Sequence, residues 1–528
     1  MMKKAALSTL ALLMASTPLS VEAKAPAALK TEASALIDGN AKLVQEMVDS
    51  VFSFQEPGFQ EFQTADYLTG ILAKNGFTIT KGVAGIPSAW TATWSNGDGP
   101  VVALGSDVDG LLGLSQVPGV PQIKPLIPGA PGHGEGHNSG MPLIVAAALA
   151  TKEVMTKHGI KGKLMLWPGV AEELLATKAY YVRAGLFKDV DVSIFTHVAS
   201  SFGTSYGDSG NNGMVSVEYS FKGITSHAAG APWSGRSALD GVELMNVAWN
   251  MRREHLPLTQ RSHYVITNGG GQPNIVPGEA TVWYYFREQT FDSIRKLYET
   301  GNEISEAAAK ATGTTVSRRV LGYAAPNYGN KPLAEAAYEN IKLVGMPKWS
   351  ADDQAFAKAV QESLKFKIAP LKTEVDPLSS PETREKSMGG GSDDIGDIMW
   401  TVPTITIRFP SNIPSMIGHN VTSAIAMATP VAHKGAVAGA KAVALTVLDV
   451  MTTPKLVSDA KTYFKTVQTK DQKYDPVLTP EDQPAIHLNK DLMERIRPEL
   501  KKYNYDPTQY PTYLEQLGIK YPTLKPAS

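Results

Sequence analysis

The chain has 528 residues, too many for one ordinary hydrophobic core, so at least two domains are expected. Its 43% hydrophobic and 19% charged residues are typical of a soluble globular protein, and its formal net charge of −1 gives no electrostatic reason to expect nucleic acid as a partner. The chain has no cysteine, which excludes disulfides, thiolate metal ligands and a thiolate nucleophile.

The N-terminus carries the one segment whose composition suggests passage through a membrane. Lys3 and Lys4 precede an apolar run over residues 5–15, and the small residues at 21–23 have the spacing of a cleavage site. The run is too short to span a bilayer as a helix. We therefore expect a signal peptide, a periplasmic or secreted protein, and no membrane span in the mature form.

Helices and a first buried strand follow. Between residues 31 and 76 the apolar spacing predicts amphipathic helices, with a break at 56–58. Residues 101–105 form a short continuous apolar run, as expected for a strand buried on both faces. Asp107 and Asp109 come directly after it, so two carboxylates stand at the C-terminal end of this strand.

A glycine-rich loop over residues 129–140 contains His133, Glu135 and His137 at alternate positions. Single glycines separate them and allow the backbone to fold tightly. Imidazole and carboxylate groups together form a ligand set suited to zinc, manganese or cobalt. Alternation alone fits an exposed histidine-rich loop equally well, so the interpretation depends on the residues that follow.

Two further apolar runs predict buried strands, and candidate ligands stand at the end of each. Glu172 and Glu173 follow the strand at 163–167, and His197 ends the strand at 192–196. A lone glutamate pair is more often solvated, and a histidine after a strand is more often structural. Helices alternate with these strands, which predicts a mostly parallel, doubly wound α/β sheet whose ligands gather at the C-terminal strand ends.

The pattern changes near residue 213. Predicted strands at 215–221 and 281–287 alternate between apolar and polar residues, and predicted helices at 238–252 and 291–312 follow them. This succession indicates an inserted α+β domain with one sheet face exposed.

The chain is then expected to return to the first domain. A helical pattern over 333–344 precedes a long loop at 375–392, which we expect to be functional because it leads into the strand at 404–407. His419 follows that strand, and an Ala- and Val-rich helix at 435–451 closes the domain.

The predicted organisation has five segments: a signal peptide (1–23), a first catalytic-domain segment (24–212), an inserted α+β domain (213–325), a second catalytic-domain segment (326–455), and a C-terminal extension (456–528). The extension is rich in Tyr, Pro, Lys and Asp and is expected to wrap irregularly over the surface.

Together these residues predict a metal-dependent hydrolase. The expected metal ligands, all imidazoles or carboxylates, are Glu135, His137, Glu173, His197 and His419. Glu135 would bridge two divalent ions that activate a shared water, and Glu172 would be the general base. Asp107, Asp109 and His133 are expected to orient the metal ligands without binding the metal themselves.

With these residues in view, the sequence resembles the M20 family of metallopeptidases and amidohydrolases. The motifs that carry the resemblance stand at 56–62, 106–110, the Glu172–Glu173 pair, 391–397 and His419, in matching order and spacing. The resemblance implies a catalytic domain with two metals, and it implies that the inserted domain (213–325) is a lid and dimerisation domain through which two subunits pair.

The resemblance also implies roles for two lid residues and reveals one departure. His227 and Asn274 stand in lid motifs whose members reach the substrate, often in the partner's site. Where Glu135 stands, this branch of the family usually has a cysteine that bridges the metals, although other branches bridge with a carboxylate. A harder oxygen ligand shifts the preference from zinc toward manganese and cobalt.

We therefore expect a homodimeric amidohydrolase that cleaves N-acyl or N-aroyl amino acids, such as aminobenzoyl-glutamate-like conjugates, with two divalent metal ions. The metals expected are zinc or manganese, with cobalt as a third option. Two alternatives stay open: a dipeptidase or carboxypeptidase acting on free peptides, and a non-catalytic relative that binds metal or ligand. Retention of Glu172 argues against the second, because a binding protein needs no general base.

Overall fold

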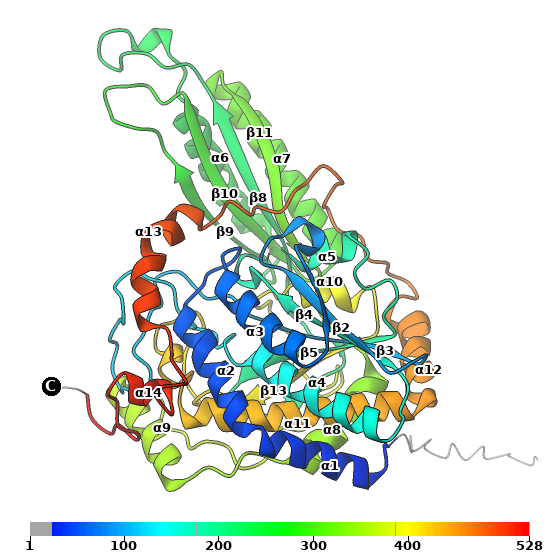
Figure 1. Ribbon diagram of the computed structural model, residues 1–528. Coiled ribbons are helices and arrows are strands. Elements are labelled where there is room, and N and C mark those ends of the chain that lie inside the picture. The colour runs from blue at the N-terminus through cyan, green and yellow to red at the C-terminus, as the bar shows by residue number, and fades with distance from the viewer. Residues whose placement is uncertain (1–23, 176, 386, 527–528) are drawn as a thin grey trace, which may run out of the picture.

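A seven-stranded sheet forms the centre of the computed structural model, which describes residues 24–175, 177–385 and 387–526 (Figure 1). The strand order is β1-β2-β4-β3-β5-β13-β6. Their bounds are β1 Thr78–Lys81, β2 Trp90–Ser95, β3 Val101–Asp107, β4 Lys163–Gly169, β5 Val192–Ala199, β6 Gly203–Thr204 and β13 Thr404–Pro410. The four central strands β4, β3, β5 and β13 are parallel, and the outer pairs are antiparallel. The predicted mostly parallel α/β sheet is confirmed.

Helices pack around this sheet and account for most of the large core. Those of the catalytic domain are α1 Ala27–Gly39, α2 Ala41–Phe54, α3 Phe62–Lys74, α4 Gly140–Lys157, α5 Lys178–Arg183, α8 Lys331–Val344, α9 Ala351–Ser363, α10 Ile395–Met399, α11 Pro430–Thr452 and α12 Pro454–Tyr463. By length and composition α11 could cross a membrane. Its apolar window is 83% buried against neighbours that include α4, α1 and β13, so it packs as a core helix.

The inserted domain is a separate four-stranded antiparallel sheet that projects from the catalytic domain (Figure 1). Its strands are β8 Gly213–Lys222, β9 Arg261–Asn268, β10 Glu279–Glu288 and β11 Thr315–Ala324, in the order β11-β8-β10-β9, and its helices are α6 Ala238–Arg252 and α7 Phe291–Thr312. In β10 every second residue is buried, which is why the sequence alternates. All these elements lie within the proposed lid segment 213–325.

The C-terminal extension is more ordered than its composition suggests. It contains α13 Lys490–Leu500 and α14 Tyr513–Gln516, and it crosses the base of the lid before returning to the catalytic domain (Figure 1). The Tyr474 hydroxyl donates to Asp397 at 2.7 Å, and the Tyr513 backbone N–H donates to Asp49 at 3.0 Å. Both acceptors are buried, so the extension is integrated into the folded core.

Candidate metal centre and active site

The candidate ligands meet at one edge of the central sheet. Parallel strands have their C-terminal ends at a common edge, where β3 ends at Asp107 and β4 ends just before a short 3₁₀ turn at Glu172–Leu174. Strand β5 carries His197 near its end, and the loop after β13 carries His419. The sheet topology therefore brings together residues that are far apart in the sequence.

His137 lies at the centre of this cluster. Its Nδ1 is 3.4 Å from Asp109 Oδ1 and 3.9 Å from Glu173 Oε1, and its Nε2 is 4.0 Å from Glu172 Oε2. The imidazole of His197 stands edge-on to that of His137, with 5.5 Å between the ring centroids.

His419 approaches the same carboxylates from the mouth of the site. Its Nε2 is 3.2 Å from Glu135 Oε1 and 3.3 Å from Glu173 Oε2. Its side chain is 61% exposed, whereas that of Glu173 is 5% exposed. All five residues predicted as metal ligands thus lie in one cluster that opens toward solvent at His419.

A strained turn presents the glutamate pair to this cluster. Ala171 (φ 50°) and Leu175 (φ 49°) both adopt the left-handed conformation on either side of Glu172–Leu174. Two neighbours hold the turn: Glu61 accepts a hydrogen bond from the Ala171 N–H at 2.7 Å, and a Cβ on Gly58 would lie 2.9 Å from the Ala171 Cα. The motif at 56–62 is therefore the support of this turn.

The donor set fits a divalent metal ion. Several buried atoms of the cluster have no hydrogen-bond partner among the described residues, namely His137 Nε2, Asp109 Oδ1, Asp107 Oδ2 and both carboxylate oxygens of Glu173. Three sets of ligand atoms each lie within 4.8 Å of one another: Asp107–His137–His197, His137–Glu172–Glu173 and Asp107–Glu172–Asp393. Buried polar atoms of this kind need a partner, and imidazole and carboxylate groups together bind divalent cations.

The pKa values in the cluster also indicate that it needs a cation. Burial raises the pKa of Glu173 to about 8. Burial lowers the pKa of His137, but Asp109, Glu173 and Asp107 outweigh it and raise that pKa to about 10. Burial alone would raise the pKa of Glu135, yet the surrounding imidazoles, His419 first, lower it to about 2. The cluster holds more negative charge than its own imidazoles balance.

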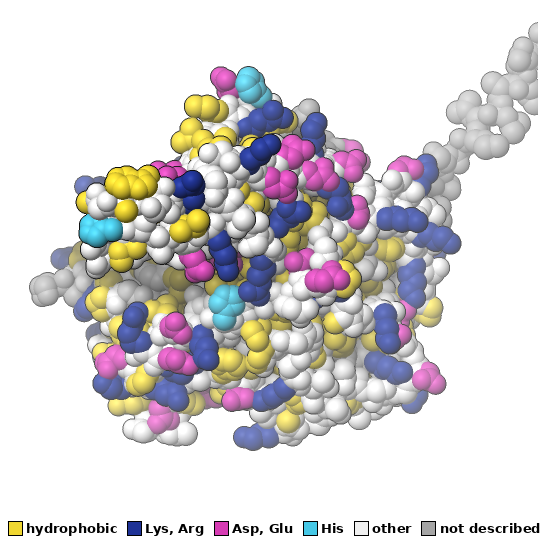
Figure 2. Space-filling view, turned by 90° about the horizontal axis from the view of Figure 1, so that it is seen from above, with side chains coloured by type: hydrophobic (Ala, Val, Ile, Leu, Met, Phe, Trp, Pro, Cys, Tyr) yellow, Lys and Arg dark blue, Asp and Glu magenta, His cyan; other side chains and the backbone are white. Residues whose placement is uncertain are grey.

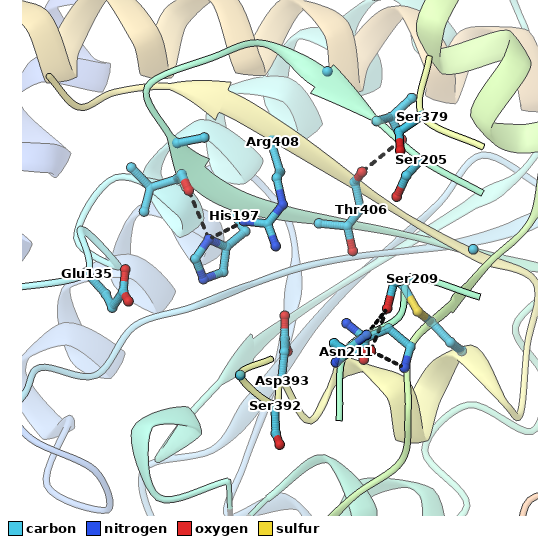
Figure 3. A pocket seen from close by; sticks show the side chains of 18 of the residues that line it. Glu135, His197, Ser205, Ser209, Asn211, Ser379, Ser392, Asp393, Thr406 and Arg408 are labelled. Atoms are coloured by element: carbon cyan, nitrogen blue, oxygen red, sulfur yellow. Dashed lines mark hydrogen bonds between the residues drawn. The ribbon is translucent and has the colours of Figure 1, made fainter. Parts of the chain in front are cut away.

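A cavity of about 760 Å³ opens beside the cluster. Figure 3 shows Glu135 and His197 on one side of it and Ser205, Ser379 and Thr406 on the other. Glu172, Glu173 and His419 also line it. A small molecule bound in this cavity would lie within reach of the candidate ligands and of Glu172.

Comparisons with known proteins identify the family of this chain. Residues 209–312 match the family model described as the peptidase dimerisation domain of M20 proteins. The chain is 31% identical over 450 residues to one of the subunits of p-aminobenzoyl-glutamate hydrolase from Escherichia coli (strain K12), an alignment that covers 80% of this chain and 92% of that protein. The chain belongs to the M20 family. It is therefore a hydrolytic enzyme of the amidohydrolase and peptidase type, as the sequence predicts.

Two further similarities of this M20 protein are to a dipeptidase and to a protein of known structure. It is 28% identical to the Xaa-Arg dipeptidase of Mus musculus, with 83% of this chain and 92% of that protein covered. Its fold matches the crystal structure of an aminobenzoyl-glutamate utilization protein from Klebsiella pneumoniae with a TM-score of 0.52 at 15% identity, over 78% of this chain and 96% of that one.

The residues predicted to orient the M20 ligands differ in their positions. Asp109 accepts the Glu173 N–H at 3.0 Å and also stands beside His137, as expected of an orienting carboxylate. His133 instead donates to the Val51 carbonyl at 3.1 Å and lies against Phe52. No hydrogen bond or ion pair of the described residues joins the His133 ring to a candidate ligand, and its orienting role stays a prediction.

The lid residues suggested by the family resemblance do not reach this chain's own site. His227 and Asn274 are both exposed and lie on adjoining segments of the lid, where the Ala228 N–H donates to the Asn274 carbonyl at 2.9 Å. Neither lines the cavity.

Lys178 is a residue of the M20 site that sequence reasoning missed. It is fully buried, its Nζ is 2.6 Å from Asp107 Oδ1, and it forms an ion pair with Asp394. The available signal was a lysine at the start of a short apolar helix directly after the glutamate pair, but nothing in the sequence assigned it a partner.

Proposed function

We propose that this M20 enzyme is a metal-dependent amidohydrolase that releases the amino acid from N-acyl amino acids, with Glu172 as general base. The observation that carries the proposal is the position of Glu172: it lines the cavity, its side chain is 9% exposed, and its Oε2 is 4.0 Å from His137 Nε2. Burial raises the pKa of Glu172 well above the ordinary value of a glutamate, and Asp107 and Asp393 raise it further. A carboxylate in such surroundings is suited to take up a proton.

Glu135, His137, Glu173, His197 and His419 would hold two divalent ions, zinc or manganese, with cobalt as a third option. When bound, these ions would polarise the amide carbonyl and favour ionisation of water. Glu172 would take the proton of the attacking water and deliver it to the departing amine nitrogen. Asp109 would keep His137 and the Glu173 backbone in place.

Arg287 supports recognition of the amino acid carboxylate. It lies on lid strand β10 and lines the cavity, and its Nε has no hydrogen-bond partner among the described residues. A guanidinium fork binds a carboxylate with two parallel hydrogen bonds. We propose that Arg287 holds the carboxylate of the amino acid that leaves.

A second candidate function is hydrolysis of dipeptides, because one similar protein is named Xaa-Arg dipeptidase. A panel of N-acyl amino acids and free dipeptides with the same C-terminal residue separates the two. The non-catalytic alternative is not carried forward, since the chain belongs to a family of hydrolases.

Glu172→Gln tests the mechanism directly. The substitution keeps the shape of the side chain and removes its ability to accept a proton, so kcat should fall by about 10²- to 10⁴-fold. The metal content, measured by elemental mass spectrometry, should stay unchanged. Glu153→Gln, on the exposed face of α4, is the matched control and should have wild-type kcat. Full activity of the Glu172 variant would refute the assignment of the base.

We further propose that the enzyme acts as a homodimer through the lid. The match to the dimerisation domain supports this, and so do apolar side chains exposed on α6 and on the free edge strand β9, among them Met251 and Val265. Figure 2, which looks down onto the lid end of the molecule, shows apolar side chains among its exposed residues. His227 and Asn274 would then serve the partner's cavity.

We also propose that the protein is exported. It is supported by the basic and apolar character of residues 3–15 and by the cleavage spacing that follows, all of which lie outside the described residues. A periplasmic or secreted location would be consistent with a chain that contains no cysteine to oxidise.

A further inference from the structure

The lining of the active-site cavity is poorly suited to an aromatic ring. Within the described residues no phenylalanine, tyrosine or tryptophan side chain lines it, and its larger apolar side chains are those of Leu175 and Met399. Sites that bind aromatic groups are usually lined by aromatic and aliphatic side chains. Hydroxyl, amide and guanidinium groups stand among small apolar side chains instead, so the wall offers hydrogen bonds to a polar occupant.

Several of these polar groups have no hydrogen-bond partner within the described residues. Thr406 Oγ1, Ser392 Oγ and Asn327 Oδ1 line the cavity, are shielded from solvent, and make no hydrogen bond within the described residues. Protein structures rarely leave buried polar atoms unpaired. A substrate that carries its own hydrogen-bonding groups would satisfy these three atoms.

Two arginines of the same cavity lack a carboxylate partner in the described chain. Arg408 stands on β13 beside the ligand cluster, with its NH1 3.2 Å from His197 Nδ1. The Arg384 guanidinium is held by the Asp208 and Tyr206 carbonyls and by the Ser379 hydroxyl. No described ion pair includes either residue, and Arg408 is exposed to the cavity (Figure 3).

Acidic residues that line the cavity have other partners than Arg408 and Arg384. Asp376 is paired with Lys372 at 2.6 Å. Asp393 lies with Asp107 and Glu172 in one of the candidate metal-ligand sets. Arg408 is therefore a guanidinium at a cavity wall with no counter-charge assigned to it, which is the arrangement that recognises an anion.

We propose that the cavity takes an acyl group bearing a second carboxylate, which Arg408 binds, and not an aroyl ring. The inference rests on the amidohydrolase function proposed above, in which Arg287 holds the carboxylate of the leaving amino acid. Arg408 and the adjoining hydroxyls, Thr406 among them, then face the acyl half. The substrate class is an N-(dicarboxylic acyl) amino acid, such as an N-succinyl conjugate.

Three substrates that share one amine component test this assignment: N-succinyl-, N-butyryl- and N-benzoyl-glutamate. Succinyl and butyryl groups have the same chain length and differ by the distal carboxylate. The wild-type enzyme should hydrolyse the succinyl substrate with a kcat/KM at least about tenfold above that of either other substrate, mainly through a lower KM, as one charge-assisted hydrogen-bond pair provides.

Variants at Arg408 then assign the preference to its guanidinium. In Arg408→Gln the ratio of kcat/KM for succinyl to that for butyryl should fall to about one, and Arg408→Lys should restore some of it because the charge returns. Metal content and thermal melting are measured for each variant, since Arg408 touches His197. Thr406→Val provides a second probe of the same wall and should lower the ratio less. Arg495→Gln, at an exposed arginine on α13, is the matched control and should keep the wild-type ratio.

The outcomes distinguish this inference from the proposed function. A wild-type preference for the benzoyl substrate, or an unchanged ratio in a folded, metal-replete Arg408→Gln enzyme, would overturn the dicarboxylic assignment and leave the amidohydrolase intact. Hydrolysis of none of the three substrates would overturn both. A succinyl preference that disappears in Arg408→Gln supports both.

Discussion

Lys178 is the buried cation on which the carboxylate wall behind the site depends. Its ammonium is enclosed completely and faces Asp107 at 2.6 Å and Asp394. Lys178→Met would leave two buried carboxylates without their counter-charge, because the methionine fills the space but carries no proton donor. The free energy of unfolding should fall by about 3–5 kcal/mol, measured by urea denaturation at neutral pH.

An exposed ion pair provides the control for this substitution. Lys81 and Asp66 are 2.5 Å apart with side chains 52% and 74% exposed, so Lys81→Met should change the unfolding free energy by less than about 1 kcal/mol. Equal losses in the two variants would show that burial does not govern the contribution of Lys178.

The meeting of the candidate ligands could be predicted from the sequence because Glu173, His197 and His419 each follow an apolar strand and parallel strands share one edge. Lys178 could not, since its partners lie 71 and 216 residues away and no periodic pattern links them. For His133 the sequence pattern was not sufficient. It alternates with His137 along the chain, but alternation in an irregular loop does not fix the direction of a side chain, and His133 points to Val51.

At the scale of elements, the ends of α6 and α7 match the sequence prediction because their caps are local. Ser237 and Thr290 accept hydrogen bonds from the first turns, and Gly313, with φ 65°, ends α7. The antiparallel strands β1 and β2 at one side of the sheet gave no comparable signal. They are short, and the outer one is mostly exposed, so the core-facing alternation that identifies a strand is incomplete.

Helix α9 offers an element-scale prediction with a pH dependence. Its first turn has a capping box in which Ser350 and Asp353 bond reciprocally, and Asp353 also pairs with Lys434 of α11 and accepts from the Tyr521 hydroxyl at 3.0 Å. Burial raises the pKa of Asp353, but Lys434 and the Ser350 N–H outweigh it and lower the pKa below its ordinary value.

A carboxyl group with a lowered pKa stabilises the fold above the pKa of the unfolded chain, and that stability disappears as the pH falls through the folded pKa. Asp353→Asn should therefore reduce the unfolding free energy by about 1–2 kcal/mol at pH 7, and the difference from wild type should shrink below about pH 4. Denaturation curves of both proteins across this range measure it. A difference that stays constant with pH would exclude ionisation as its source.

At the scale of the whole molecule, the C-terminal extension joins the lid base to the catalytic domain. Arg295 of α7 pairs with Asp475 at 2.8 Å, Tyr474 reaches Asp397 of α10, and Arg497 of α13 pairs with Glu56 in the motif that supports the glutamate turn. These contacts connect the lid, the core and the Glu172 turn through one continuous segment. The sequence did not predict them, because they are single polar contacts between distant elements rather than a repeated pattern.

The proposed dimer leads to a prediction about the whole assembly. If His227 acts in the partner's cavity, then His227→Ala and Glu172→Gln damage different halves of a shared site. Each variant alone should have little activity, but an equal mixture that exchanges subunits should recover about a quarter of wild-type activity, because half of the dimers are mixed and each of these has one intact site.

Met251→Glu in both chains should abolish the recovery and give monomers by sedimentation velocity, since it places charge on an apolar side chain that is 70% exposed in the single chain. Leu343→Glu, on the catalytic domain and 65% exposed, should leave the recovery unchanged. Mixed dimers without recovered activity would show that His227 does not act in the partner's cavity.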